Sequence, residues 1–332
     1  MPAPTVSVVL LVWNNHEHLR ACLRALQAQT VRDFEIILVD NGSAETDALN
    51  AICQAHPTLR ITARRLETNT GFAAGNNAGA RLAQGTWLAL LNVDAFPQPD
   101  WLETLLRAAE ENPDYACFTS RQVQFHAPRL LDGAGDSYHI TGLAWRRFYN
   151  RSVQEYGSQG GEVFSACPAA AMYLREEFMR AGGFDEDYFS YFEDVDLGFR
   201  IRLGGGKCLY VPGAVVHHVG SASTGRRSDF SVYYGYRNLI WTFVKNMPSP
   251  LVWLFLPLHI ATISFFIAYL TLRGQGGAVW RAVFDALRGL PSVFKKRRTI
   301  QRTRNVKLGE LLGVMSTGLF EPYREFNMRN KR

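Results

Sequence analysis

The chain has 332 residues, of which 47% are hydrophobic and 20% are charged, a composition that excludes global disorder and suits an α/β domain with an appended segment. Residues 1–240 contain 21 Lys and Arg against 26 Asp and Glu, a net charge of −5, whereas residues 241–332 contain 15 against 4, a net charge of +11. Because the positive charge is confined to the tail, no nucleic-acid partner is expected. The five cysteines are scattered and include no Cys-x-x-Cys pair, which argues against a disulfide scaffold or a zinc ribbon.

Strands and helices are predicted to alternate along the first hundred residues. Short runs rich in Val, Ile and Leu are interpreted as buried strands, and segments with apolar residues at helical spacing are interpreted as helices. The predicted strands are 6–13, 34–39, 59–66 and 86–92, and the predicted helices are 18–29, 45–55 and 71–84. This order predicts a doubly wound α/β sheet that binds its ligands where the strands end.

The tail at 246–332 differs in character from the rest of the chain. Residues 251–272 carry no formal charge, and this segment is long enough to cross a bilayer as a helix. A buried core helix is the alternative. Apolar and charged residues at helical spacing follow at 278–294, and four basic residues stand at 295–298, a pattern typical of a helix on an anionic membrane surface. A single crossing would place the nine Lys and Arg of 273–304 opposite the front of the chain, against the positive-inside tendency. We therefore expect monotopic attachment.

Polar side chains follow the predicted strands at the edge where ligands are expected. Asn14 and Asp40 come directly after the first two strands, and Asn92 and Asp94 follow the fourth. A carboxylate at position 40 can accept hydrogen bonds from a base or a ribose hydroxyl, although Asp is also a common helix cap. Asn92 and Asp94 are two positions apart and so point the same way, toward a divalent cation that carries a diphosphate; Asn-x-Asp is also common in turns.

A Gly-rich turn opens the third predicted helix. Residues 69–79 read Asn-Thr-Gly-Phe-Ala-Ala-Gly-Asn-Asn-Ala-Gly, in which Gly71 and Gly75 allow a ligand to approach the backbone. The glycine spacing does not match the dinucleotide fingerprint Gly-x-Gly-x-x-Gly, so a nicotinamide-dependent dehydrogenase is a weak alternative.

Acidic residues are densest at the start of a helix predicted to begin near position 193. Glu193, Asp194 and Asp196 stand there together, and their mutual repulsion raises the pKa of one of them, as a general base requires. Arg200 lies within helical reach of Asp196 and can fix its orientation. An acid-rich helix start with a purely structural role is the alternative.

Two further motifs add cationic side chains. His217 and His218 end a strand-like segment next to a Gly-Ser turn, and this pairing favours a metal or diphosphate site over a core histidine. Arg237 precedes the apolar segment of the tail, where it either binds a phosphate bidentately or lies on a solvated helix face.

Taken in order, these motifs resemble an inverting glycosyltransferase of family 2. The resemblance covers roughly residues 5–245 and rests on short stretches in a fixed order. These stretches are 8–14, 39–43, 69–77, 91–94, 183–185, 193–196 and 218–221. The Gly-Phe-Asp-Glu and Glu-Asp-Val-Asp motifs with Arg237-Asn238 are most similar to the rhamnosyltransferase-like branch, whose enzymes build bacterial cell-surface polysaccharide on polyprenyl diphosphate carriers.

The resemblance implies the GT-A (Rossmann-like) fold, a mixed and mostly parallel sheet with helices on both faces. It implies a glycosyltransferase domain at 1–245, with a nucleotide-binding half at about 1–115 and an acceptor half at about 116–245, before the membrane-associating helical tail. The implied reaction transfers a sugar with inversion from a nucleotide-sugar donor, best represented by dTDP-rhamnose, to a hydroxyl of a polyprenyl-diphosphate-linked saccharide. The implied location is the cytoplasmic face of the bacterial inner membrane, in contact with anionic lipid.

The resemblance also implies a role for each matching position. Asp194 is expected to be the catalytic base, with Glu193 and Asp196 positioning the acceptor or the base, and Arg237 is expected to bind phosphate. Asp94 and His218 are expected to bind Mg²⁺ or Mn²⁺. The expected nucleotide-binding residues are Asn14, Asp40, Asn69, Gly71, Asn76 and Asn92.

Two positions leave alternatives open. The metal motif of the family has an acidic residue at both ends, whereas this chain has Asn92 at the first, so metal binding is expected to depend more on His218. The choice of base between Asp194 and Asp196 also stays open. Two other functions remain: hexosyl transfer from a UDP- or GDP-sugar to polyprenyl phosphate, and a non-catalytic membrane scaffold that binds nucleotide sugars.

Overall fold

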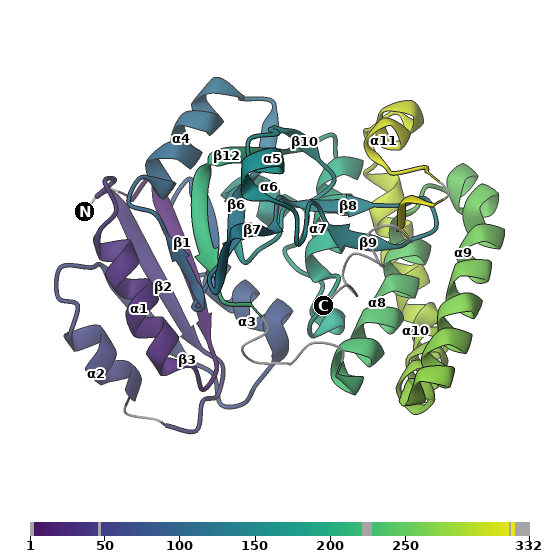
Figure 1. The fold of residues 1–332 in the computed structure, drawn as a ribbon, viewed down its shortest axis with the longest axis horizontal. Coiled ribbons are helices and arrows are strands. Elements are labelled where there is room, and N and C mark those ends of the chain that lie inside the picture. Colours follow the sequence, from purple (N-terminus) through teal and green to yellow (C-terminus); the bar gives the residue numbers. More distant parts are fainter. Residues whose placement is uncertain (1–2, 46–47, 221–227, 319, 323–332) are drawn as a thin grey trace.

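Ten strands form one mixed sheet in the computed structural model, which describes residues 3–45, 48–220, 228–318 and 320–322 (Figure 1). The strands of this sheet are β1 (Val6–Val12), β2 (Phe34–Asp40), β3 (Ile61–Arg65), β4 (Trp87–Asn92), β5 (Ala95–Pro97), β6 (Tyr115–Gln124), β7 (Ala127–Gly133), β10 (Gly161–Val163), β11 (Ala170–Leu174) and β12 (Lys207–His218). Their main order is β10-β12-β6-β11-β4-β1-β2-β3, with β5 paired to β12 and β7 paired to β6. The run β4-β1-β2-β3 is parallel, whereas β11 is antiparallel to both β4 and β6. A separate hairpin pairs β8 (Asp136–Tyr138) with β9 (Ala144–Arg146).

Helices cover both faces of the sheet. They are α1 (His16–Gln27), α2 (Ala48–Gln54), α3 (Gly71–Ala80), α4 (Trp101–Glu111), α5 (Val153–Tyr156), α6 (Arg175–Arg180), α7 (Glu193–Leu203), α8 (Asp229–Asn246), α9 (Ser249–Leu270), α10 (Gly276–Arg302) and α11 (Leu308–Val314), with short turns η1 (Glu186–Tyr188) and η2 (Thr271–Gln275). Alternate residues of β1 belong to different cores: Val8 packs with Leu23 and Trp101 on one face, and Val9 packs with Leu197 on the other. The strand is therefore apolar apart from Ser7, which donates to Glu35 of β2, because both faces of the strand are buried. This arrangement confirms the predicted fold class.

The C-terminal helices pack against the part of the sheet domain that contains β8 and α7. In Figure 1, α8, α9 and α10 lie side by side at the end of the molecule farthest from β3. The chain reverses between α9 and α10 at Gly274, whose φ of +84° is the left-handed conformation that favours glycine. One apolar cluster joins Tyr138 and Phe199 to Leu251 and Met315, so packing continues across the boundary expected near residue 245.

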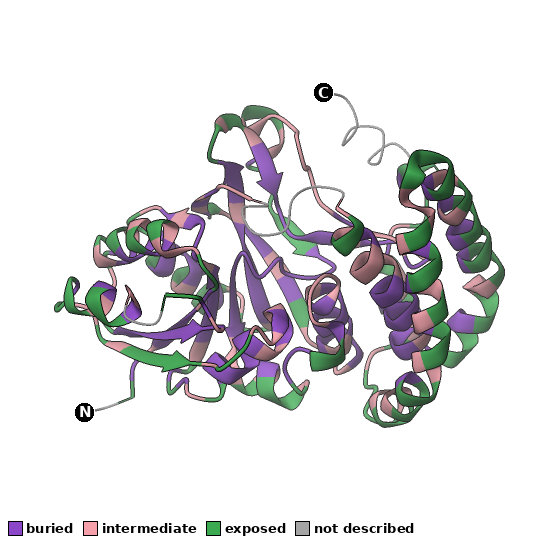
Figure 2. Ribbon diagram, turned by 90° about the horizontal axis from the view of Figure 1, so that it is seen from below, coloured by how far each residue is buried: buried purple, intermediate pink, exposed green. Residues whose placement is uncertain are grey.

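The helix α9 is held to the domain at its midpoint. Within the part of the chain that the structure describes, one helix, which lies in the stretch Ser249–Arg302 that turns at Gly274, is long and apolar enough to cross a membrane by length and composition. His259 donates from Nδ1 to the carbonyl of Thr141 at 2.7 Å, and its ring stacks on Phe243 with centroids 3.9 Å apart. The inward sides of these helices are buried and their outward sides are exposed (Figure 2).

Candidate active site

Asp40 ends β2 and is completely buried. Its Oδ1 accepts a hydrogen bond from the Ser43 backbone N–H at 2.9 Å, and its Oδ2 pairs with Arg65 Nη1 at 2.5 Å. Arg65 also donates from Nη2 to the Ser43 carbonyl at 2.6 Å. Asp40 therefore orders the turn that follows β2 and holds a partly exposed guanidinium beside it. Its predicted contact with the nucleotide stays a prediction.

Amide side chains connect the ends of the first three strands. The Asn14 backbone N–H donates to Ser43 Oγ at 2.9 Å, which ties the end of β1 to the turn after β2. Asn41 donates from Nδ2 to Asn69 Oδ1 at 3.0 Å, and the same oxygen accepts from the Gly71 N–H at 2.9 Å. The structure thus brings Asn14, Asn69 and Gly71 to the edge that Asp40 occupies, as expected for parallel strands.

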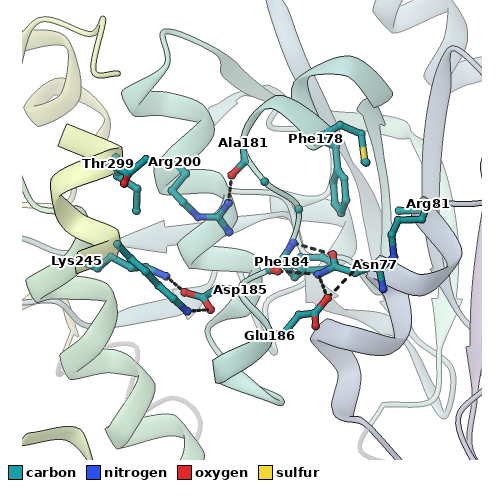
Figure 3. A pocket seen from close by; sticks show the side chains of 16 residues that line it. Asn77, Arg81, Phe178, Ala181, Phe184, Asp185, Glu186, Arg200, Lys245 and Thr299 are labelled. Carbon is teal, nitrogen blue, oxygen red and sulfur yellow. Dashed lines mark hydrogen bonds and ion pairs between the residues drawn. The ribbon is translucent and has the colours of Figure 1, made fainter. Parts of the chain in front are cut away.

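The two asparagines of α3 have different surroundings. Asn76 donates from Nδ2 to the Phe72 carbonyl one turn earlier in the same helix. Asn77 reaches across to the acceptor half, where it accepts from the Phe184 N–H at 2.9 Å and donates to Glu186 Oε1 at 3.0 Å (Figure 3). Asn77 therefore joins the two halves of the domain, whereas the nucleotide-binding role of Asn76 stays a prediction.

The pairing of β5 with β12 places Asp94 next to His218. Asn92 ends β4, Asp94 lies in the turn that follows, and the register places His218 opposite Ala95. As a result, His218 Nε2 lies 3.4 Å from Asp94 Oδ1, and both side chains are buried. The structure brings together these two predicted metal ligands, while Ser221 of the same motif lies outside the described residues.

Asp132 and Arg146 support His218 from behind. His218 donates from Nδ1 to Asp132 Oδ2 at 2.7 Å, and Arg146 Nη1 pairs with that oxygen at 2.5 Å. Burial alone would lower the pKa of His218, but the hydrogen bond with Asp132 and the negative charges of Asp132 and Asp94 outweigh it and raise the pKa to about 9. Burial would likewise raise the pKa of Asp94, but its contact with His218 outweighs this and lowers it.

The geometry of this pair fits a divalent cation. His218 Nε2 is buried and has no hydrogen-bond partner among the described residues, while Nδ1 donates to a carboxylate, as is usual for a histidine that binds a metal through its other nitrogen. Two bonds of about 2.1 Å that meet at a right angle hold their ligand atoms about 3 Å apart, close to the 3.4 Å between Nε2 and Asp94 Oδ1. Asp94 and His218 are therefore suited to bind one shared ion. Asn92 lies two positions before Asp94 in the chain.

Asp194 lies in the first turn of α7 beside a second carboxylate and a thiol. Ligand atoms of Asp136, Cys167 and Asp194 lie within 4.8 Å of one another. Burial raises the pKa of Asp194, and the charge of Asp196 acts in the same direction, which outweighs the opposing effects of the Val195 N–H and nearby Arg146. A half-buried carboxylate with a raised pKa is suited to accept a proton.

Glu193 is the most isolated of the three acids. It is buried, and its Oε2 has no hydrogen-bond partner among the described residues. Burial and the charge of Asp194 raise the pKa of Glu193 well above the ordinary range. Glu193 is therefore expected to be neutral when Asp194 is charged.

Asp196 is fully engaged in internal contacts and has no exposed surface. Its Oδ1 accepts from Asn246 Nδ2 at 2.7 Å and pairs with Lys245 Nζ at 2.8 Å, and its Oδ2 pairs with Arg200 at 2.8 Å. Burial would raise the pKa of Asp196, but the charges of Arg200 and Lys245 outweigh it and lower the pKa. The geometry thus favours Asp194 over Asp196 as the base, and Arg200 orients Asp196 as the sequence indicated.

Asp185 joins α8 to α10 through two lysines. Lys245 Nζ pairs with Asp185 Oδ2 at 2.5 Å, and Lys296 of α10 pairs with Asp185 Oδ1 at 2.5 Å (Figure 3). The cavity behind them, about 480 Å³ between α3, α6, α7 and α10, is lined by neither Asp94 nor Asp194. It is therefore separate from the candidate active site.

Arg237 and Asn238 hold the segment before α7. Arg237 is buried, donates from Nη2 to the carbonyls of Asp187 and Tyr188 at 2.8 and 3.0 Å, and stacks over Trp241 with 4.3 Å between its Cζ and the ring centroid. These contacts fix the turn η1, so the guanidinium lies in a structural position, and phosphate binding by Arg237 stays a prediction. Asn238 is described further below.

Sequence reasoning did not single out four residues that complete the site. Arg65 is 25 residues from its partner Asp40, and Asp132 is 86 residues from His218. Asp136 and Arg146 are 58 and 48 residues from Asp194. Rules of local spacing could not assign partners so far apart. The stretch Asp132-Gly-Ala-Gly-Asp136, two acids around a Gly-rich turn, was the one local signal available. It connects the carboxylate behind His218 to the carboxylate beside Asp194.

Comparison with known proteins identifies the family. The profile described as Glycosyl transferase family 2 matches residues 7–181, just over half of the chain. The chain therefore belongs to glycosyl transferase family 2, in its rhamnosyltransferase-like branch, and it is a glycosyltransferase.

Individual relatives agree with this assignment. The chain is 28% identical over 250 residues to the N-acetylglucosaminyl-diphospho-decaprenol L-rhamnosyltransferase of Mycobacterium tuberculosis H37Rv, covering 66% of this chain and 77% of the relative. It is 27% identical over 172 residues to the putative glycosyltransferase EpsH of Bacillus subtilis, covering 47% and 49%.

Solved structures share the GT-A fold. GalNAc-T7, solved with UDP, GalNAc and Mn²⁺, superimposes with a TM-score of 0.60 at 18% identity, covering 73% of this chain and 48% of that one. The mannosyltransferase PcManGT of Pyrobaculum calidifontis, solved with GDP-Man and Mn²⁺, gives a TM-score of 0.55 at 18% identity, covering 99% and 85%.

Proposed function

We propose that the protein transfers a sugar, with inversion, from a nucleotide-sugar donor to a hydroxyl of a polyprenyl-diphosphate-linked saccharide. The observation that carries this proposal is the separation of two sets of side chains: a metal-suited pair, Asp94 and His218, and a proton acceptor, Asp194, joined through the segment 132–146. The pair Asp94 and His218 would act on the leaving group, and Asp194 would act on the attacking hydroxyl. The relative from M. tuberculosis, named for rhamnosyl transfer to N-acetylglucosaminyl-diphospho-decaprenol, supports rhamnose as the transferred sugar, and dTDP-rhamnose is the donor that we propose.

The Asp94–His218 pair is proposed to hold Mg²⁺ or Mn²⁺. A cation bound there would offset the charge that develops on the departing nucleotide diphosphate. The two structural neighbours solved with Mn²⁺ support this assignment. Asp132 holds the His218 ring with Nε2 toward Asp94, so the ring needs no reorientation before binding. Binding removes the proton from Nε2, because a metal ligand must be the neutral imidazole.

Asp194 is proposed to be the general base. It accepts the proton of the acceptor hydroxyl as the oxygen attacks the anomeric carbon, while the bond to the diphosphate breaks on the opposite side. Its raised pKa brings the proton affinity closer to that needed near neutral pH. The charge of Arg146 opposes this rise in the pKa of Asp194 and favours its ionised form. The ion pairs of Asp196 with Arg200 and Lys245 hold the first turn of α7 in place.

The C-terminal helices are proposed to attach the enzyme to the cytoplasmic face of the membrane. Large apolar side chains are exposed along both helices and the turn between them: Trp253, Leu254, Leu258, Ile260, Phe265, Leu272, Trp280, Phe284, Leu287 and Phe294. Exposed basic residues stand on α10 with them: Arg281, Arg288, Lys295 and Arg298. This combination suits insertion into an interface of anionic lipid. Because His259 ties the middle of α9 to Thr141, the helix is proposed to lie in the interface and not to span.

The test is a transfer assay with purified protein in lipid nanodiscs. Donors are dTDP-rhamnose, UDP-hexoses and GDP-hexoses with Mn²⁺, and acceptors are N-acetylglucosaminyl-diphospho-decaprenol and decaprenyl phosphate. Rhamnosylation of the lipid-linked sugar, with an anomeric configuration opposite to the donor's by NMR, supports the proposal. A product formed on decaprenyl phosphate supports the hexosyl-transfer alternative. If no donor reacts although nucleotides bind, the protein is a scaffold and the proposal is wrong.

A further inference from the structure

Four aromatic rings, two from the turn before α7 and two from the start of α8, form a cluster. Phe189 and Tyr191 belong to the turn before α7, and Phe230 and Tyr234 belong to the first turns of α8; we name these four residues the aromatic platform. Phe189 stacks on Tyr234 with centroids 5.2 Å apart, and Phe230 lies 4.7 Å from Tyr234 and 6.2 Å from Tyr191. Phe230 is 36% exposed and the other three are half-buried, so part of the cluster is open to solvent.

The backbone that presents the platform is strained. Phe189, Tyr191 and Phe192 have φ of +64°, +67° and +67°, a region that bulky side chains rarely adopt. Asn238 of α8, which is fully buried, holds this turn by donating from Nδ2 to the carbonyls of Ser190 and Tyr191 at 2.9 and 2.8 Å. Strain of this kind persists only where surrounding contacts enforce it, and it gathers at ligand sites.

The platform contacts the predicted nucleotide edge, and two of its residues belong to the turn that leads into α7. The Phe189 carbonyl accepts from the Ala73 N–H at 3.2 Å, and a Cβ on Gly71 would lie 2.6 Å from the Phe189 ring. Gly71 belongs to the predicted nucleotide edge. On the other side, Asp194 follows Tyr191 by three residues. An acceptor whose hydroxyl reaches Asp194 lies near this turn, because only three residues separate Tyr191 from Asp194.

We propose that the aromatic platform binds the sugar ring of the acceptor by stacking, an inference that rests on the proposed function. A pyranose presents a face of weakly positive C–H groups, which packs on the negative face of an aromatic ring. The attacking hydroxyl must come within about 3 Å of the base carboxylate, so the part of the acceptor beside Asp194 is its saccharide. The polyprenyl chain is accommodated by the apolar surface of α9 and α10.

The test compares Phe230→Leu, which keeps an apolar side chain but removes the ring, with Phe230→Tyr, which keeps the ring. Acceptor and donor KM are measured with N-acetylglucosaminyl-diphospho-decaprenol and with an analogue that carries a short alkyl chain. F230L is expected to raise the acceptor KM about tenfold with both acceptors, the factor that corresponds to the loss of one aromatic contact. The donor KM stays unchanged, and F230Y stays near wild type.

An unchanged acceptor KM in F230L, or an increase seen only with the long lipid, overturns the platform while leaving the transferase function intact. Absence of transfer by the wild type overturns the function and the platform together. Folding of each variant is checked by the increase in melting temperature that dTDP with Mn²⁺ produces. If F230L does not fold, Tyr191→Leu provides the same test on the other side of the cluster.

Discussion

Asp194 and Asp196 stand two positions apart in α7, yet replacement of each by Asn is expected to have opposite consequences. Asp196→Asn keeps the size of the side chain and removes its charge. We expect it to destabilise the folded protein, because Arg200 and Lys245 lose the carboxylate that pairs with both of them. Asp194→Asn serves as the matched control in the same helical turn.

The magnitude follows from the burial of the network. Asp196 is 0% exposed, and the side chains of Arg200 and Lys245 are 8% and 1% exposed. Removal of one partner of a buried ion pair reduces the free energy of unfolding by about 3–5 kcal/mol. Lys245 keeps its contact with Asp185, so we expect a value near the lower end, about 3 kcal/mol. That is a large share of the ~5–15 kcal/mol by which folded proteins are stable.

The control is expected to lose activity and keep its stability. General-base catalysis contributes about 10²–10⁴-fold to a rate, so D194N is expected to lower kcat by that factor. Because the folded-state pKa of Asp194 is raised, its charged form destabilises the folded protein at pH values above that pKa, and Asn removes this effect. Its free energy of unfolding is therefore expected to equal or exceed that of the wild type at neutral pH.

Urea denaturation in detergent, followed by tryptophan fluorescence, gives the stabilities, and initial rates normalised to folded protein give kcat. The reasoning is refuted if D196N is as stable as the wild type while its kcat falls as far as that of D194N. That result would assign the base to Asp196 and show that its contacts with Arg200 and Lys245 are dispensable for folding.

Three further outcomes are expected. The acidic limb of the kcat/KM profile should lie above the ordinary carboxylate range near pH 4, because burial raises the pKa of Asp194 and activity needs its charged form; a limb at or below pH 4 contradicts this. Mn²⁺ titration by calorimetry should show the largest loss of Mn²⁺ affinity in His218→Ala and a loss of about 10–100-fold in Asp132→Asn. Equal Mn²⁺ affinity in the wild type and both variants would exclude the proposed metal site. Trp253→Ser with Trp280→Ser should reduce flotation with anionic liposomes and leave the melting temperature unchanged, since both rings are exposed; unchanged flotation would show that another surface binds lipid.

Local sequence patterns were sufficient to predict β1 to β4, the fold class and the side chains at the ends of these strands, whereas the strands after residue 92 were not predicted, apart from the strand-like segment that ends at His218. The residues of β1 and β2 are mostly apolar because both faces of these strands are buried, so Asp40 and Asn92 could be placed at the strand ends from the sequence pattern. The pairing of Asp94 with His218, more than a hundred residues apart, was predicted through the family resemblance and is explained by the register of β5 with β12.

Only the tertiary structure distinguished Asp194 from Asp196. The two have the same residue type and nearly the same position in the helix. Lys245 and Arg200 form ion pairs with Asp196, whereas Asp136 and Cys167 lie close to Asp194. The supporting residues behind His218 and the strained turn held by Asn238 were likewise invisible to spacing, because their contacts join elements that are distant in sequence.

The sequence by itself determined that this chain forms a GT-A sheet, that polar residues collect at its ligand edge and that an apolar, basic segment follows. The tertiary structure decided how these groups are paired with other side chains, and it decided how the long apolar helix packs against the domain, through the contact between His259 and Thr141. The physical reason is that hydrophobic periodicity is set by each element's own burial, whereas charge pairing, pKa values and helix docking depend on partners that only the folded chain brings together.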